Sequence, residues 1–299
     1  MASATALFGD SPLETLDIDG VRMAFRRCGQ GPPLLLVHGF PQTHAIWHRV
    51  APQLASRYSL VMPDLRGYGD SARPATTGDH APYSKRAMAN DLAGLMRALG
   101  HMRYQVCGHD RGGRVAHRLA LDHADAVARL MLLDISPTRT MYERTTMEFA
   151  RAYYHWFFLI QPAPLPETLI GADPRFYLHA KLGGWGSGGM QLFDPRALAE
   201  YERCFTPPAI HAMCEDYRAA ASIDLEHDRA DADRRIECPV RVLWGERGVV
   251  QRLFTPIEDW QQRTRLPVTG RTTPGGHYIP EESPDLLVDD MLAFFVEQP

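Results

Sequence analysis

Apolar and polar residues alternate at the start of the chain and then give way to continuous apolar runs. Asp19-Gly20, a turn dipeptide, interrupts the alternation over residues 16–18 and 21–25, which predicts a β-hairpin. Residues 34–37 (LLLV) are apolar at every position, as is typical of a parallel strand buried on both faces. Similar runs predict strands over residues 59–62, 104–107, 130–133, 240–244 and 268–272.

Helical spacing of apolar residues follows most of these predicted strands. It predicts helices over residues 46–54, 88–99, 115–119 and 286–295. Gly100 supplies the C-cap of the second helix, since glycine adopts the left-handed conformation that ends many helices. Ser283 and Pro284 form the N-cap and first position of the last helix.

Strand and helix alternate from Leu34 to Asp134 and again from Val240 to the end, which predicts an α/β fold with a doubly wound, mostly parallel sheet. The alternation breaks in between, where aromatic residues and prolines are frequent. We therefore predict a helical cap over residues 136–235, inserted into a core formed by residues 1–135 and 236–299.

Composition narrows the class of protein. Of the 299 residues, 45% are hydrophobic, which is enough to bury a large core. The net charge of −4 and the absence of a basic run argue against nucleic acid or anionic membrane as partners. Five cysteines without a C-x-x-C pair indicate free thiols. Residues 1–14 lack a secretory pattern and no long apolar stretch follows, so we expect a cytoplasmic protein.

The segment GHDRG at residues 108–112 lies where a predicted strand meets a predicted helix. Gly108 and Gly112 flank Asp110 in the small-x-nucleophile-x-small arrangement of a sharp strand-to-helix turn. Such a turn presents its central side chain above the carboxyl ends of the strands, where open α/β sheets bind ligands. An isolated aspartate here would be interpreted as a helix N-cap, but the glycines and the context favour a nucleophile.

Two further residues complete a candidate triad in the order nucleophile, acid, histidine. Asp134 ends a predicted strand, and His277 lies between the last strand and the last helix. Taken singly, each would be an ordinary loop or turn residue. Glu246, which follows the strand predicted over residues 240–244, is a weaker rival for the acid. Phe40 follows the first buried strand, where its backbone N–H could stabilise an oxyanion or simply belong to a turn.

A carboxylate nucleophile suits a substrate with a leaving group on an sp³ carbon, such as an alkyl halide or an epoxide. Asp110 would form an alkyl ester, and His277 would activate the water that hydrolyses it. Asp134 would orient the imidazole and stabilise its charged form. The scheme needs no metal and no organic cofactor.

Several motifs resemble the carboxylate-nucleophile branch of the α/β-hydrolases, which contains haloalkane dehalogenases, epoxide hydrolases and fluoroacetate dehalogenases. The resemblance spans nearly the whole chain and is nearest to the fluoroacetate dehalogenases. The motifs are HGFP at residues 38–41, DLRGYGDS at 64–71, GHDRGGR at 108–114, LLDISP at 132–137 and GGHYIPEE at 275–282.

Arg111 and Arg114 distinguish between the members of that branch. Haloalkane dehalogenases and many epoxide hydrolases have tryptophan directly after the nucleophile, where this chain has Arg111. Two guanidinium groups beside Asp110 could bind a substrate carboxylate through bidentate hydrogen bonds. The alternative is that both arginines form structural salt bridges, one of them with Asp110 itself.

The resemblance also implies a halide site. In the fluoroacetate dehalogenases a His-Trp pair and a tyrosine of the cap surround the halide, and His155, Trp156 and Tyr217 match these positions. Judged by its aromatic-rich surroundings alone, Trp156 would belong to the core. Trp185 could line the pocket or serve in packing.

The resemblance thus predicts hydrolytic dehalogenation of a small 2-haloacid, and it implies fluoroacetate, hydrolysed to glycolate and fluoride, as that substrate. The expected binding partner of the protein is its small-molecule haloacid substrate. The family resemblance also implies that the protein forms a homodimer. Two alternatives remain. An epoxide hydrolase would use the same triad, with Tyr153 or Tyr217 protonating the epoxide oxygen. A non-catalytic protein that binds small acids would not need the triad.

Overall fold

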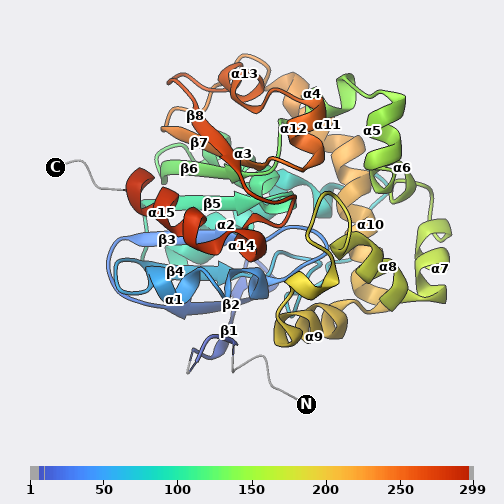
Figure 1. Cartoon of the computed structure of the whole chain (residues 1–299), viewed down its shortest axis with the longest axis horizontal. Helices are drawn as coiled ribbons and strands as arrows, with labels where there is room; N and C mark the ends of the chain where they lie inside the picture. Colours follow the sequence, from blue (N-terminus) through green and yellow to red (C-terminus); the bar gives the residue numbers. More distant parts are fainter. Residues whose placement is uncertain (1–6, 10, 296–299) are drawn as a thin grey trace.

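The computed structural model describes residues 7–9 and 11–295, which form an eight-stranded sheet covered by helices (Figure 1). The expectation for residues 1–14 thus falls partly on residues 1–6 and 10, outside the described residues. The strands are β1 (Leu13–Ile18), β2 (Val21–Cys28), β3 (Pro33–Val37), β4 (Ser59–Pro63), β5 (Tyr104–His109), β6 (Val127–Leu133), β7 (Val240–Gly245) and β8 (Thr269–Thr273). Every predicted strand is present, so the predicted α/β fold is confirmed.

The order of the strands places a crevice in the middle of the sheet. The order is β1-β2-β4-β3-β5-β6-β7-β8, with β1, β2 and β4 antiparallel and all later neighbours parallel. From β3 the chain first passes outward to β4 and then returns to β5 on the other side of β3. The carboxyl ends of β3 and β5 therefore flank the topological switch point, where such sheets bind ligands.

Seven α-helices of the described chain accompany the sheet outside the region between β6 and β7. They are α1 (Ala51–Leu54), α2 (Lys85–Ala98), α3 (Arg111–Asp122), α12 (Val249–Leu253), α13 (Pro256–Gln261), α14 (Ile279–Glu282) and α15 (Pro284–Phe294), with short 3-10 helices at His44–Trp47 and Ala81–Tyr83. A further 3-10 helix, Met190–Leu192, lies in the region between β6 and β7. Helices α2 and α3 pack together on one face, and α14 and α15 cover the other (Figure 1). Gly100 follows α2 with a φ of +85°, as predicted.

The predicted helix over residues 46–54 is wrong. The segment forms a 3-10 turn over His44–Trp47 and a single helical turn over Ala51–Leu54. Pro52 explains the break, because it has no N–H for the carbonyl of His48 and its ring would collide with that carbonyl. Ser283 does occupy the N-cap position of α15, but its hydroxyl donates to the carbonyl of Pro274 at 2.5 Å and does not cap the helix.

The region between β6 and β7 is helical and lies over the carboxyl ends of the strands, at the right of Figure 1. Its α-helices are α4 (Thr138–Glu143), α5 (Met147–Ala152), α6 (His155–Phe158), α7 (Leu165–Ala172), α8 (Pro174–Leu182), α9 (Pro195–Cys204), α10 (Pro207–Ala221) and α11 (Ile223–Ala230). We refer to α4–α11 as the cap. The domain boundaries at residues 136 and 235 stay a prediction.

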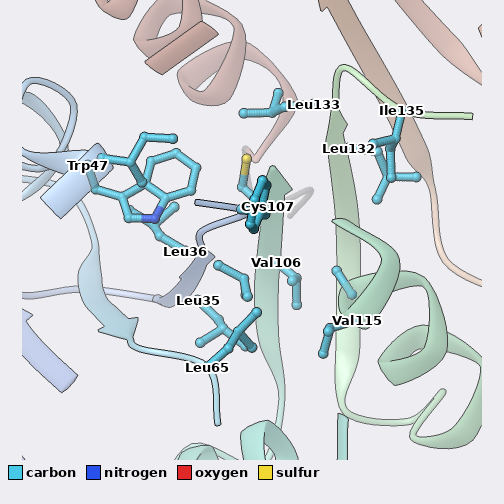
Figure 2. Close-up of a cluster of buried hydrophobic side chains, with 14 of the residues drawn as sticks. Leu35, Leu36, Trp47, Leu65, Val106, Cys107, Val115, Leu132, Leu133 and Ile135 are labelled. Atoms are coloured by element: carbon cyan, nitrogen blue, oxygen red, sulfur yellow. The ribbon is translucent and has the colours of Figure 1, made fainter. Parts of the chain in front are cut away.

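The central strands are buried on both faces. Figure 2 shows Leu36 of β3 and Cys107 of β5 near Trp47, while Val106 and Val115 lie in the layer between the sheet and α3. All of these side chains are inaccessible to solvent. The core thereby fixes the strand ends that carry the candidate site. Within the described residues, every helix is too short or too polar to span a bilayer.

Candidate active site

Asp110 lies in a strained turn between β5 and α3. Its φ of +47° and ψ of −115° fall outside the regions that L-residues favour. The neighbouring chain approaches closely: a Cβ on Gly112 would lie 2.3 Å from the carbonyl oxygen of His38, and one on Gly108 would lie 2.6 Å from that of Gly112. Only glycine fits either position, so the sharp turn predicted from GHDRG is present.

The Asp110 carboxylate faces the carboxyl ends of the strands and does not cap the helix. Its side chain accepts no hydrogen bond from α3, although the residue occupies the N-cap position. Instead, Oδ2 accepts the backbone N–H of Phe40 at 3.1 Å. Burial would raise the pKa of this carboxyl, but the charges of His277 and Arg114 outweigh it and lower the pKa. Asp110 is therefore an ionised carboxylate at neutral pH.

His277 lies between the two aspartates of the candidate triad. Its Nδ1 is 2.6 Å from Oδ2 of Asp134, and its Nε2 is 3.9 Å from Oδ1 of Asp110. A carboxylate only accepts, so Nδ1 carries a proton, and Nε2 is the nitrogen that faces Asp110 and can act as a base when the ring is neutral. The other oxygen of Asp134 accepts the N–H of Gly245 at 3.0 Å. Glu246, the rival acid, is exposed, so the geometry favours Asp134.

Electrostatics favour a charged His277 in the free protein. Burial would lower its pKa, but the hydrogen bond and charge of Asp134, with the charge of Asp110, outweigh burial and raise the pKa above the ordinary 6.5. His109, which the sequence did not identify as a candidate, also fixes the loop that carries His277. Its Nε2 lies 2.8 Å from the carbonyl oxygen of His277.

Arg111 makes a buried ion pair, but with Asp216 and not with Asp110. Its Nε donates to Oδ2 of Asp216 at 2.9 Å, and its Nη2 donates to Oδ1 at 2.7 Å and to the main-chain oxygen at 2.8 Å. Its Nη1 is buried and has no hydrogen-bond partner among the described residues. The alternative of a structural salt bridge is thus partly correct for Arg111, because the residue pairs with a carboxylate but keeps Nη1 without a partner among the described residues.

Arg114 has no carboxylate partner within the part of the chain that the structure describes. Its Nη1 donates to the carbonyl of Ser136 at 3.2 Å and to the hydroxyl of Thr138 at 3.0 Å, and its Nη2 lies 3.2 Å from the sulfur of Met141. Its Nε is buried without a partner. Burial lowers the pKa of Arg114, whereas the charge of Asp110 raises it. Arg114 is therefore a buried cation that no carboxylate of the described residues pairs with directly, although the charge of Asp110 acts on it.

Aromatic rings from the cap enclose this region. The ring of His155 lies 6.0 Å from that of Phe40, 5.5 Å from Tyr217 and 4.6 Å from Trp185. Trp185 in turn lies 5.1 Å from His277, which places it at the site. Burial, followed by the charge of Lys181, holds the pKa of His155 well below 6.5, so its imidazole is neutral.

Three buried polar atoms of this aromatic wall lack partners among the described residues. They are Nδ1 of His155 and the hydroxyls of Tyr153 and Tyr217. Buried polar groups are normally hydrogen-bonded, so a set of unpaired ones beside a nucleophile indicates atoms kept for a ligand. Trp156 lies beneath Arg114, with its ring 4.7 Å from the guanidinium carbon. The halide roles of His155, Trp156 and Tyr217 stay predictions.

A metal-like arrangement occurs elsewhere. Asp70, Glu200 and Cys204 offer ligand atoms within 4.8 Å of one another. Nη2 of Arg203 lies 2.5 Å from Asp70 and 2.6 Å from Glu200. The guanidinium thus already supplies the positive charge that these carboxylates require. None of these residues belongs to the triad.

Comparisons with known proteins show the family to which the chain belongs. The model of the α/β-hydrolase fold family matches residues 32–247. A fluoroacetate dehalogenase from Burkholderia sp. is 49% identical over 258 residues, which cover 86% of this chain and 84% of that protein. A soluble epoxide hydrolase from Corynebacterium sp. strain C12 is 34% identical, covering 93% of this chain and 95% of that protein.

A solved structure extends the similarity to three dimensions. A crystal structure of an α/β hydrolase from Nostoc sp. PCC 7120 superposes with a TM-score of 0.94 at 52% identity, covering 97% of this chain and 99% of that one. The match to the family model and the extent of these alignments lead to one conclusion: the chain belongs to the α/β-hydrolase family, among relatives that include fluoroacetate dehalogenases and epoxide hydrolases.

Proposed function

We propose that this protein is a hydrolytic dehalogenase of small 2-haloacids that converts fluoroacetate to glycolate and fluoride. One observation carries the proposal: two buried guanidinium groups, each with an unpaired N–H, lie beside the ionised Asp110. A substrate carboxylate bound by Nη1 of Arg111 and Nε of Arg114 would be oriented for attack at its α-carbon. The similarity to a fluoroacetate dehalogenase supports the same chemistry.

The first step is attack by Asp110. Oδ1 is the attacking atom, since Oδ2 is held by the N–H of Phe40. A bond forms between Oδ1 and the α-carbon while the carbon–halogen bond breaks, and the halide leaves with the bonding electrons. The neutral His155 and the hydroxyl of Tyr217, both buried and unpaired, are the hydrogen-bond donors proposed for the departing halide.

The second step hydrolyses the ester. Nε2 of His277 takes a proton from water, and the hydroxide adds to the side-chain carbonyl carbon of Asp110. The negative charge that develops on Oδ2 meets the N–H of Phe40. The C–O bond to glycolate then breaks, and the leaving alkoxide takes the proton back from His277. Asp110 is left as a carboxylic acid that carries the added hydroxyl, and it releases this proton to water, which restores the carboxylate. Asp134 stabilises the imidazolium between these transfers.

An epoxide hydrolase is the second candidate, and a specific observation favours it. The hydroxyls of Tyr153 and Tyr217 are both buried and unpaired, as donors for an epoxide oxygen would be. Burial raises the pKa of both well above 10, so both remain protonated. A neutral epoxide, however, has no use for Arg111 and Arg114, so we favour the haloacid.

Replacing Arg111 by alanine should weaken the use of haloacids by about 30-fold or more in kcat/KM, because a buried charged hydrogen bond of about 2 kcal/mol or more is lost. Release of chloride from chloroacetate measures the effect. Arg118→Ala is the matched control, since Arg118 lies on the same helix and pairs with Asp228 and Asp231. That variant should lower the melting temperature with KM unchanged. Unaltered kinetics in Arg111→Ala would remove the carboxylate clamp.

The imidazole of His277 should titrate above pH 6.5 in the free protein, because Asp134 and Asp110 stabilise its charged form. As pH falls through this pKa the base is lost, so ester hydrolysis should slow toward acid pH. Formation of the ester removes the negative charge of Asp110, which lowers the pKa of His277 in the intermediate. The decrease in the rate of ester hydrolysis should therefore occur at a lower pH than the titration of His277 in the free protein. An NMR titration of wild type and Asp134→Asn tests this. A wild-type pKa at or below 6.5, or no decrease in the variant, would contradict the assigned electrostatics.

A further inference from the structure

The guanidinium of Arg111 is held so that a single nitrogen remains available. Arginine offers five N–H groups in a planar fork. Three of them, one on Nε and two on Nη2, are bound to Asp216. The ring of Tyr217 covers one face of the guanidinium, with its centroid 4.1 Å from Cζ. The two N–H groups on Nη1 are therefore left for a ligand. The orientation of the guanidinium is fixed by Asp216 along one edge and by Tyr217 on one face.

Asp216 is itself fixed by residues of the core. Oδ2 accepts the hydroxyl of Tyr68 at 2.6 Å in addition to Nε of Arg111, and Oδ1 accepts Lys85 in addition to Nη2. Four donors thus occupy the approximately four acceptor positions of a carboxylate. The side chain is fully buried. Burial would raise the pKa of Asp216, but the charges of Arg111 and Lys85 lower it, so it is ionised throughout the working range.

This network joins the cap to the core. Asp216 lies on α10, whereas Arg111 lies on α3, Lys85 begins α2, and Tyr68 lies in the loop after β4. Asp224 of α11 forms a second link between the cap and the core. It accepts the backbone N–H of Lys85 at 2.8 Å, and its carboxylate lies 3.5 Å from Nζ of Lys85. Arg111 and Lys85 are thereby balanced by Asp216 and Asp224. The position of Arg111 consequently depends on where α10 packs against the core.

We propose that Asp216 is a positioning residue that fixes Nη1 of Arg111 on the substrate carboxylate and so determines the affinity for acids. The inference rests on the proposed function. Asp216 does not touch the substrate and acts through Arg111 alone. Without the carboxylate of Asp216, only the ring of Tyr217 and the main-chain oxygen of residue 216 would hold Arg111. Part of the energy gained from binding the substrate carboxylate would then be needed to order the guanidinium.

Asp216→Asn tests the proposal, because asparagine keeps the shape but has one acceptor oxygen and no charge. The KM for chloroacetate should rise at least about tenfold, since a charge-assisted hydrogen bond is lost. The Kd for acetate, an unreactive acid, should rise by the same factor. Asp224→Asn is the matched control: it removes the same charge from the same network without touching Arg111, so KM should change less than about threefold.

A purely structural role for Asp216 predicts a different pattern: a lower melting temperature and less active protein, with KM and the acetate Kd unchanged. That pattern would overturn the proposal, as would an equal rise of KM in Asp224→Asn. If Asp216→Asn does not fold, Asp216→Glu keeps the charge but moves the carboxylate by one methylene, and KM should again rise; a wild-type KM would then overturn it.

The proposed function can fail separately from this inference. If the wild type releases no halide from any haloacid, the dehalogenase proposal is wrong. The acetate Kd still tests Asp216 in that case, because it requires only that Arg111 binds a carboxylate. A weaker acetate complex in Asp216→Asn supports the positioning role, and an unchanged one contradicts it.

Discussion

Asp110→Asn should abolish halide release from haloacids while the protein remains folded. An amide is a far poorer nucleophile than a carboxylate, and losing a nucleophile of this kind typically lowers kcat by roughly 10⁴- to 10⁶-fold, or about 5.5–8 kcal/mol. Asparagine has nearly the same shape and still offers an oxygen to the N–H of Phe40, which now binds Oδ2. The initial rate of chloride release measures the loss, and a melting curve verifies the fold.

A change of charge alone should not have this effect. Asp70→Asn makes the same substitution at a residue that pairs with Arg203 and takes no part in the candidate triad. Chloride release by that variant should be close to that of the wild type. If Asp110→Asn showed a normal initial rate, Asp110 would not be the nucleophile and the two-step scheme would be lost.

His277→Ala should stop the reaction after the ester on Asp110 has formed and before it is hydrolysed. Asp110 can still attack, but no base remains at the position where Nε2 lies 3.9 Å from Oδ1. One equivalent of halide per active site should appear as a burst, and turnover should then fall by roughly 10⁴-fold or more. Mass spectrometry of the stalled protein should find one carboxymethyl ester on the peptide that contains Asp110.

The double variant Asp110→Asn/His277→Ala provides the matched control for this adduct. It should show neither the burst nor the added mass, because the acceptor carboxylate is gone. Asp134→Asn should accumulate the ester to a lesser degree, since His277 keeps its place but loses the charge that stabilises its imidazolium. No adduct at any time in His277→Ala would count against a covalent intermediate.

The arrangement of the candidate triad could be predicted from the sequence because each of its members follows the end of a strand. Apolar runs located β5 and β6, and parallel strands bring their carboxyl ends to one edge. Asp110 and Asp134 follow these strands directly, and His277 follows β8 after a short loop. The glycines around Asp110 added a steric constraint that the structure satisfies, since no Cβ fits at Gly112.

The partners of the arginines could not be predicted in this way. Asp216 lies 105 positions from Arg111, and the two meet only because α10 packs over the core. The one available signal in the sequence was that Asp216 directly precedes Tyr217, and no rule of sequence spacing predicts from this that Asp216 contacts Arg111. The helix expected over residues 46–54 failed for a local reason, since spacing alone gave no weight to Pro52.

The central claim is tested most directly by offering the wild-type protein fluoroacetate, chloroacetate and a simple neutral epoxide in parallel. An ion-selective electrode follows fluoride and chloride, and diol formation follows the epoxide. We expect that fluoride and chloride are both released and that the epoxide is not turned over. Robust hydrolysis of the epoxide, with no halide from either acid, would contradict it and assign the site of Asp110 and His277 to an epoxide hydrolase.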